Sequence, residues 1–189
     1  RQLGAALDIS TDEFVHTTEA RHRQAVWTLW QRLRPGDLYK KTYTGLYCIG
    51  CEDFYSERDL VNGCCPDHKL PPVAVEEENY FFRLSAYQEQ IEALLASGQL
   101  AITPEKRRLE VVNFVQQGLH DISVSRGSAR ASGWGITVPG DVSQTIYVWI
   151  DALINYLTGL GFGTQDNWEE FWGPDSRIIH CLGKNVWKF

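Results

Sequence analysis

The sequence lacks the features that mark exported and membrane proteins. It has no apolar run near the roughly 18 residues of a membrane span, and its amino terminus does not resemble a signal peptide. Acidic residues outnumber basic ones by 24 to 18, and a net charge of −6 argues against binding nucleic acid mainly through counterion release. We therefore expect a globular protein of the cytoplasm or an organelle matrix. An acidic protein can still carry a local basic face.

Methionine is absent from the whole chain, including residue 1, and the chain stops at Phe189 where a helix is expected to begin. We therefore expect a piece excised from a longer protein. Its 189 residues, 43% of them hydrophobic and 12% aromatic, are enough for one good core or two smaller ones.

Cysteine is scarce, and four of the five cysteines lie close together. In a chain without an export signal this clustering favours a metal site over a disulfide framework. Cys48 and Cys51 form one pair with a two-residue spacer, and Cys65 and His68 form another. Two such pairs can complete the tetrahedron of a structural Zn²⁺. The alternatives are Cys64 in place of Cys65, and a reduced turn without metal.

The stretch with the clearest change of pattern runs from Gln144 to Tyr156. Residues 145–149 are β-branched and aromatic, which predicts a buried strand. From Asp151 onward the apolar positions have helical spacing, so a helix is expected within two residues of the strand's end. Ligands collect at such corners of open α/β sheets, although aromatic residues on a helix usually belong to the core. The candidate pocket residues are Trp149, Ala152 and Tyr156.

A second strand-to-helix corner is expected near the end of the chain. Residues 177–182 have the composition of a buried strand, and Gly183, Lys184 and Asn185 follow it. Backbone N–H groups and a lysine at a helix start suit a phosphate, whereas the plain alternative is an ordinary turn.

Other segments have simpler interpretations. Apolar residues at helical spacing predict a helix that ends at Pro35, with His16 and His22 read as surface or capping residues. Ser85 and Gln88 are spaced as a capping box at the start of another helix. The densest basic patch is expected to be a solvated face or, less simply, a phosphate-facing surface. It consists of Arg21, Arg23, Arg32, Arg34, Lys40 and Lys41.

Taken in order, these motifs resemble the methionyl-tRNA synthetase family, of the bacterial or organellar type with one metal knuckle. The resemblance covers essentially all 189 residues, and the ordered set is far more specific than any single motif. It is carried by residues 14–19, the paired ligands within 48–68, and residues 77–85, 122–126, 134–136, 147–156 and 183–185.

The resemblance implies an α/β fold that is part of a split Rossmann catalytic domain of class I synthetases, with an inserted connective domain carrying a zinc knuckle. Residues 1–35 would end the first half of the Rossmann domain, and residues 142–189 would start its second half. Residues 36–141 would be the connective domain, with the knuckle at 48–68.

The resemblance also implies methionine–tRNA ligase activity, in which ATP activates methionine to methionyl-adenylate before transfer to tRNA(Met). The implied cofactors are structural Zn²⁺ and, as substrate, ATP with Mg²⁺, and we expect a monomer that binds no membrane. Arg126 would serve activation, and Asn185 departs from the family's usual aspartate. The implied methionine-binding residues are Trp149, Ala152, Tyr156 and Val186, the ATP-binding residues Gly183, Lys184 and Asn185, and the zinc ligands Cys48, Cys51, Cys65 and His68.

Two other functions remain open at this point. One is a zinc-stabilised RNA-binding or interaction module that kept the fold without the chemistry. The other is a class I synthetase for leucine, isoleucine or valine.

The resemblance places both class I signature motifs outside this chain, one before residue 1 and one after Phe189. We therefore predict that the isolated chain catalyses no methionine-dependent exchange between ATP and pyrophosphate, because groups needed around the nucleotide are missing. Exchange above background by the purified 189-residue chain would contradict this.

Overall fold

A computed structural model describes Gly4 and residues 6–51, 53–129, 134–165, 168–183 and 186–187. The chain divides into two compact units. One is continuous, Arg34–Arg130, and the other combines Arg1–Leu33 with Ala131–Phe189. Within the described ranges, no helix is both long enough and apolar enough to cross a membrane.

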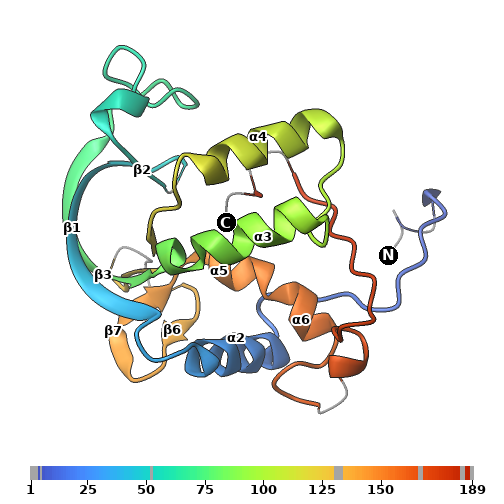
Figure 1. The fold of residues 1–189 in the computed structure, drawn as a ribbon. Coiled ribbons are helices and arrows are strands. Elements are labelled where there is room, and N and C mark those ends of the chain that lie inside the picture. The colour runs from blue at the N-terminus through green and yellow to red at the C-terminus, as the bar shows by residue number, and fades with distance from the viewer. Residues whose placement is uncertain are drawn as a thin grey trace. The chain divides into compact units, whose positions relative to one another are not determined.

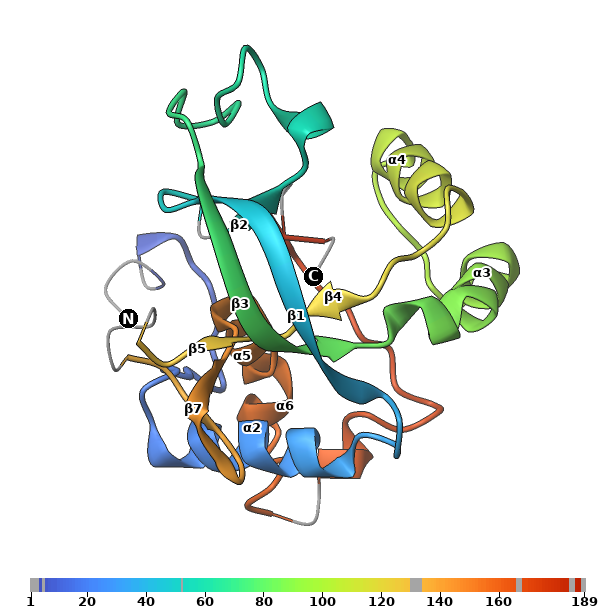
Figure 2. The same ribbon diagram turned by 90° about the vertical axis from the view of Figure 1, so that its left-hand side faces the viewer.

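The continuous unit is built on a four-stranded sheet with the order β2-β1-β3-β4 (Figures 1 and 2). Its centre is the long antiparallel pair β1 (Leu38–Cys48) and β3 (Val73–Phe82), flanked by β2 (Asp53–Tyr55) and β4 (Ile122–Ser123). The register is regular over the pair, from Leu38 opposite Phe82 to Tyr47 opposite Val73. A short 3-10 turn, η1 (Glu57–Asp59), lies between β2 and β3, and β5 (Ser125–Gly127) follows β4.

An aromatic stripe explains why this sheet forms. Tyr39, Tyr43 and Tyr47 are separated by even intervals on β1, so all three lie on one face of the sheet. Tyr39 and Tyr43 lie 5.9 and 6.0 Å from Phe81 on the neighbouring strand, measured between ring centroids. Tyr43 and Tyr47 meet Phe54 edge-on at 4.7 and 5.0 Å. Cross-strand aromatic pairs of this kind stabilise both pairing and register.

The sheet is followed by two helices that lie side by side, α3 (Gln88–Ser97) and α4 (Glu105–Gln116) (Figure 2). The capping box expected at Ser85 and Gln88 is wrong, because the 3-10 turn η2 (Leu84–Tyr87) precedes α3 and both side chains bond elsewhere. Ser85 donates to Asp121 from its hydroxyl (2.6 Å) and its backbone N–H (3.2 Å). Gln88 donates to the carbonyl of Val115 and accepts from the N–H of Leu119.

The described part of the discontinuous unit contains helical segments and a small β pair. Its elements are α2 (Ala20–Arg32), β6 (Thr137–Val138), β7 (Asp141–Ile146), α5 (Val148–Leu153), α6 (Asn155–Gly159) and the 3-10 turn η3 (Trp168–Glu170). Strands β6 and β7 are antiparallel. The indole N–H of Trp27 on α2 donates to the carbonyl of Thr137 at 2.9 Å, which ties that helix to β6.

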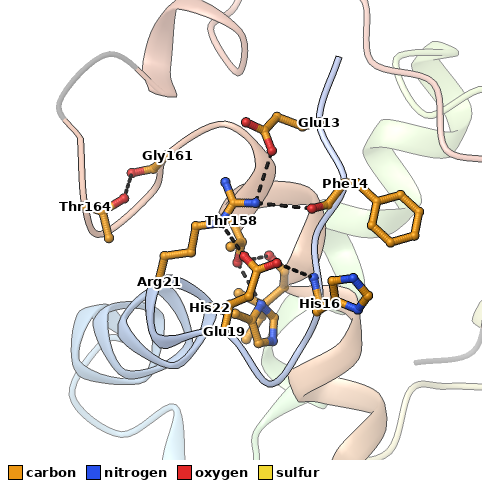
Figure 3. Close-up of polar contacts among 10 residues, drawn as sticks. Glu13, Phe14, His16, Glu19, Arg21, His22, Thr158, Gly161 and Thr164 are labelled. Carbon is orange, nitrogen blue, oxygen red and sulfur yellow. Dashed lines mark hydrogen bonds and ion pairs between the residues drawn. The ribbon is translucent and has the colours of Figure 1, made fainter. Parts of the chain in front are cut away.

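Arg21, a member of the expected basic patch, is neutralised in this unit. Its guanidinium forms ion pairs with Glu13 at 3.1 Å and Glu19 at 2.5 Å (Figure 3). It also donates to the carbonyl of Phe14 at 3.3 Å. Arg21 therefore fastens the segment before α2 to that helix.

Two strand expectations are wrong. The strand expected at 145–149 ends at Ile146, and α5 begins at Val148, so Trp149 lies in the first helical turn. Tyr147 is the last extended residue, and its carbonyl accepts the first helical bond from Asp151. Residues 177–182 form neither a strand nor a helix, and Ile179 is 71% exposed. Apolar composition alone does not make a strand, because a neighbour must complete the hydrogen-bond ladder.

The Asp121 carboxylate accepts hydrogen bonds from separate segments of the continuous unit and so helps to hold them together. Burial opposes its ionisation, but hydrogen bonds from Ser85 and from the Tyr39 hydroxyl (2.6 Å) lower the pKa of Asp121 below its ordinary value. Because the pKa is lowered in the folded state, the stabilisation is present above the unfolded pKa and is lost as pH falls through the folded pKa.

We predict that Asp121→Asn destabilises the protein by about 1–3 kcal/mol at pH 7, since an amide offers one acceptor where the carboxylate offers two. The difference from wild type should shrink as the pH falls below about 4. Urea unfolding followed by far-UV circular dichroism at several pH values measures this, with the exposed Asp12→Asn as control. A loss of stability that stays constant down to pH 2 would refute the charge-based explanation.

Candidate functional site

The four ligand-type residues of the two pairs meet at one end of the continuous unit's sheet. Cys48 is the last residue of β1, Cys51 follows in the turn, and Cys65 and His68 come from the loop that leads to β3. One ligand atom from each lies within 4.8 Å of all the others. Chain segments 14 to 20 residues apart are thus brought to a single point.

The donor set fits a tetrahedral zinc ion. Zn–S and Zn–N distances of about 2.3 and 2.0 Å imply edges of roughly 3.5–3.8 Å between ligand atoms. The Cys51 Sγ lies 3.4 Å from the Cys65 Sγ and 3.1 Å from the His68 Nδ1. The Cys48 Sγ and Cys65 Sγ lie 3.8 and 4.0 Å from the same nitrogen. These four distances each lie within about half an ångström of the ideal edges.

The backbone explains why Cys65, and not Cys64, joins this group. Val61 and Cys64 exchange two backbone hydrogen bonds, of 2.9 and 3.1 Å, and Cys64 is not part of the four-residue cluster. Gly50 is equally specific, because a Cβ there would lie 2.6–2.8 Å from ring atoms of His68. Only glycine lets the imidazole pack against the Cys48–Cys51 turn.

The thiols of the cluster differ in their tendency to ionise. Burial raises the pKa of Cys51 to about 12, against the opposing hydrogen bond that it accepts from the Tyr55 hydroxyl at 3.1 Å. Burial also acts against ionisation of Cys65, but hydrogen bonds from the His68 backbone, Cys51 and the His68 ring lower the pKa of Cys65 to about 6. One thiolate is thus favoured, and full deprotonation of the set calls for a cation.

Arg126, the expected activation residue, is a buried side chain on β5. Its guanidinium donates to the Ser123 hydroxyl at 2.8 Å and to the Ser125 carbonyl at 2.9 Å. It also lies 5.3 Å from the centre of the Phe54 ring. These contacts fix the direction of the positive charge within the continuous unit.

The three candidate pocket residues before residue 160 lie on the α5–α6 pair of the other unit. Trp149, Ala152 and Tyr156 are all half-buried. At about 100° per residue, positions i, i+3 and i+7 share one helical face. The ring of Tyr156 meets His180 edge-on at 4.6 Å, and His180 also lies 5.6 Å from Trp172.

The second corner is described only in part. The Val186 N–H donates to the Gly183 carbonyl at 3.0 Å. Lys184 and Asn185 lie outside the described residues. Of the expected phosphate site and its neighbour, the structure therefore describes Gly183 and Val186.

Sequence reasoning missed one buried polar cluster. His22, interpreted as a surface or capping residue, is 0% exposed and hydrogen-bonds Asp151 and Thr158. The spacing of the sequence does indicate its burial, because His22 lies four residues before Val26 and seven before Leu29, on the apolar face of the helix.

Known proteins resemble both units. A family model described as "tRNA synthetases class I (M)" matches residues 1–71 and 68–189. The chain is 43% identical over 192 residues to methionine–tRNA ligase of Caldanaerobacter subterraneus subsp. tengcongensis, and 43% over 199 residues to the mitochondrial enzyme of Bos taurus. All of this chain is aligned, against 29% and 33% of those proteins.

Solved structures agree with the sequence relatives. Methionyl-tRNA synthetase of Mycobacterium tuberculosis in complex with methionyl-adenylate matches with a TM-score of 0.79 at 40% identity. That match covers 92% of this chain and 35% of the other. The apo form of the same enzyme gives a TM-score of 0.78 over the same share of this chain.

Fold and family match together define the class of protein, which is a class I aminoacyl-tRNA synthetase. The chain spans about a third of the length of the relatives that it matches. Within the class, it belongs to the methionyl-tRNA synthetase family.

For the cysteine cluster we predict close to one zinc per chain in the purified protein, measured by elemental analysis. Cys48→Ser or His68→Ala should lose the metal, because three ligands hold a structural ion poorly. Cys64→Ser is the matched control and should retain it. Metal loss in Cys64→Ser together with retention in Cys65→Ser would overturn the ligand assignment.

Proposed function

We propose that this chain is part of a methionine–tRNA ligase, which activates methionine with ATP to methionyl-adenylate and transfers the methionyl group to tRNA(Met). The observation that carries the proposal is about 40% identity over the whole chain to methionine–tRNA ligases, spread across both units. The protein would act in the cytoplasm or an organelle matrix.

The methionine side chain would lie against the half-buried face of α5 and α6. Trp149 and Tyr156 offer aromatic edges, and Ala152 leaves room between them. A thioether interacts well with aromatic rings, and an apolar cage separates it from smaller aliphatic chains. Val186 would add a further apolar wall.

The polar half of the reaction needs positive charge near the carboxylate of methionine and the phosphates of ATP. Arg126 would serve activation, as the family resemblance implies, and its hydrogen bonds to Ser123 and Ser125 hold the guanidinium in one direction. Gly183, Lys184 and Asn185 would lie beside the nucleotide, with Asn185 accepting from a ribose hydroxyl without adding charge.

The zinc ion would be structural. Three cysteines and one histidine leave no open coordination position, so the ion supplies cross-linking and not reaction chemistry. Cys48, Cys51, Cys65 and His68 would close the loop between β1 and β3.

The test is amino-acid-dependent exchange between ATP and pyrophosphate by the full protein that contains this chain. Methionine should exceed leucine, isoleucine and valine in kcat/KM by about 100-fold. Trp149→Ala should raise the KM for methionine about tenfold, because an apolar wall is lost.

Trp134→Ala, at an exposed tryptophan of the same unit, is the control and should stay within about twofold of wild type. Preference for another aliphatic amino acid would indicate a different class I synthetase. No exchange with any amino acid would favour the module without chemistry.

A further inference from the structure

A buried polar cluster joins α2 to the α5–α6 pair. His22 comes from the first turn of α2, Asp151 from α5 and Thr158 from α6. The His22 Nδ1 lies 2.8 Å from the Thr158 Oγ1 (Figure 3). The His22 Nε2 lies 2.6 Å from the Asp151 Oδ1. All three residues are at most 3% exposed, and all belong to the discontinuous unit.

The hydrogen bonds of this cluster form one connected set. Nε2–H donates to the carboxylate of Asp151, and the Thr158 hydroxyl meets the other ring nitrogen. Thr158 Oγ1 also lies 3.2 Å from the Ile154 carbonyl, which already accepts from two backbone N–H groups at 3.0 Å. The hydroxyl proton is therefore not needed at Ile154, and it can turn to Nδ1. Removing the ring would strand a buried carboxylate and a buried hydroxyl.

The cluster lies behind the proposed methionine-binding face. Within residues 148–159, the buried positions are Asp151, Ile154 and Thr158. At about 100° per residue they point roughly opposite to the face of Trp149, Ala152 and Tyr156, which is half-buried.

The two helices are separate pieces, so a side chain that bonds to both of them can hold their relative orientation. α5 ends at Leu153 and α6 begins at Asn155, with Ile154 between them in αR geometry (φ −68°, ψ −12°). Trp149 and Ala152 lie on the first piece and Tyr156 on the second. The separation of the pocket walls therefore depends on the angle between the pieces. His22 bonds one residue of each piece and so fixes that angle.

We propose that His22 is a positioning residue that sets the width of the methionine pocket by holding α5 and α6 in one relative orientation. This rests on the proposed function of the α5–α6 face. His22 itself touches no substrate; it acts through Asp151 and Thr158.

The experiment compares His22 variants in the full protein by steady-state exchange kinetics and by equilibrium dialysis of labelled methionine without ATP. His22→Ala should raise the KM and the dissociation constant for methionine about 10- to 100-fold, the cost of displacing a binding group by about an ångström. The KM for ATP should stay within about twofold of wild type, as expected for a group that the change does not displace.

Two further variants keep the test decisive if His22→Ala does not fold. His22→Gln can still donate to Asp151 and should recover most of the methionine affinity. Thr158→Val keeps the shape but loses the hydroxyl bond, and should weaken methionine binding less than His22→Ala does.

The matched control is Val26→Ala, one turn further along the same helix and equally buried. It should lower thermal stability but leave the KM for methionine near wild type. The proposal is overturned if Val26→Ala and the His22 variants change the methionine KM equally, or if the His22 and Thr158 variants do not change it. Failure of the proposed function is a separate result, because the wild-type protein would then show no methionine-dependent exchange.

Discussion

A buried imidazole must satisfy both ring nitrogens, and in the discontinuous unit His22 does so with residues more than 120 positions away. Apolar packing alone tolerates small rotations of one helix on another, whereas two hydrogen bonds of 2.6 and 2.8 Å do not. The orientation of α2 relative to α5 and α6 is therefore fixed by directional hydrogen bonds as well as by apolar packing. The width of a methionine pocket built on α5 and α6 would therefore depend on His22, a side chain of a different helix.

In the continuous unit, other interactions hold the elements in their relative positions. Its long β1–β3 pair is registered by aromatic contacts, and hydrogen bonds from Ser85 and Tyr39 converge on Asp121. The loop at one end of the sheet contains a compact Cys3His cluster in place of an apolar core. A loop of this size has little surface to bury, so a metal can contribute the stability that packing does not.

Much of this organisation could be predicted from local pattern. The two chelating pairs and the helix over residues 20–32 follow from spacing. Family resemblance was needed to name a ligand. What pattern misjudged were features decided by distant partners. Ser85 and Gln88 have the spacing of a cap, yet the 115–121 segment offers both of them stronger bonds.

The same reason explains the two misplaced strands and the missed histidine. Residues 145–149 are β-branched and aromatic, but the carbonyl of Tyr147 already accepts a helical bond, so two of them are helical. Residues 177–182 have a strand's composition, but composition supplies no neighbour. His22 looked like a polar residue at a helix start, and only Asp151 and Thr158 make its burial favourable. In each case the deciding free energy belongs to a pair of residues, which one local segment does not contain.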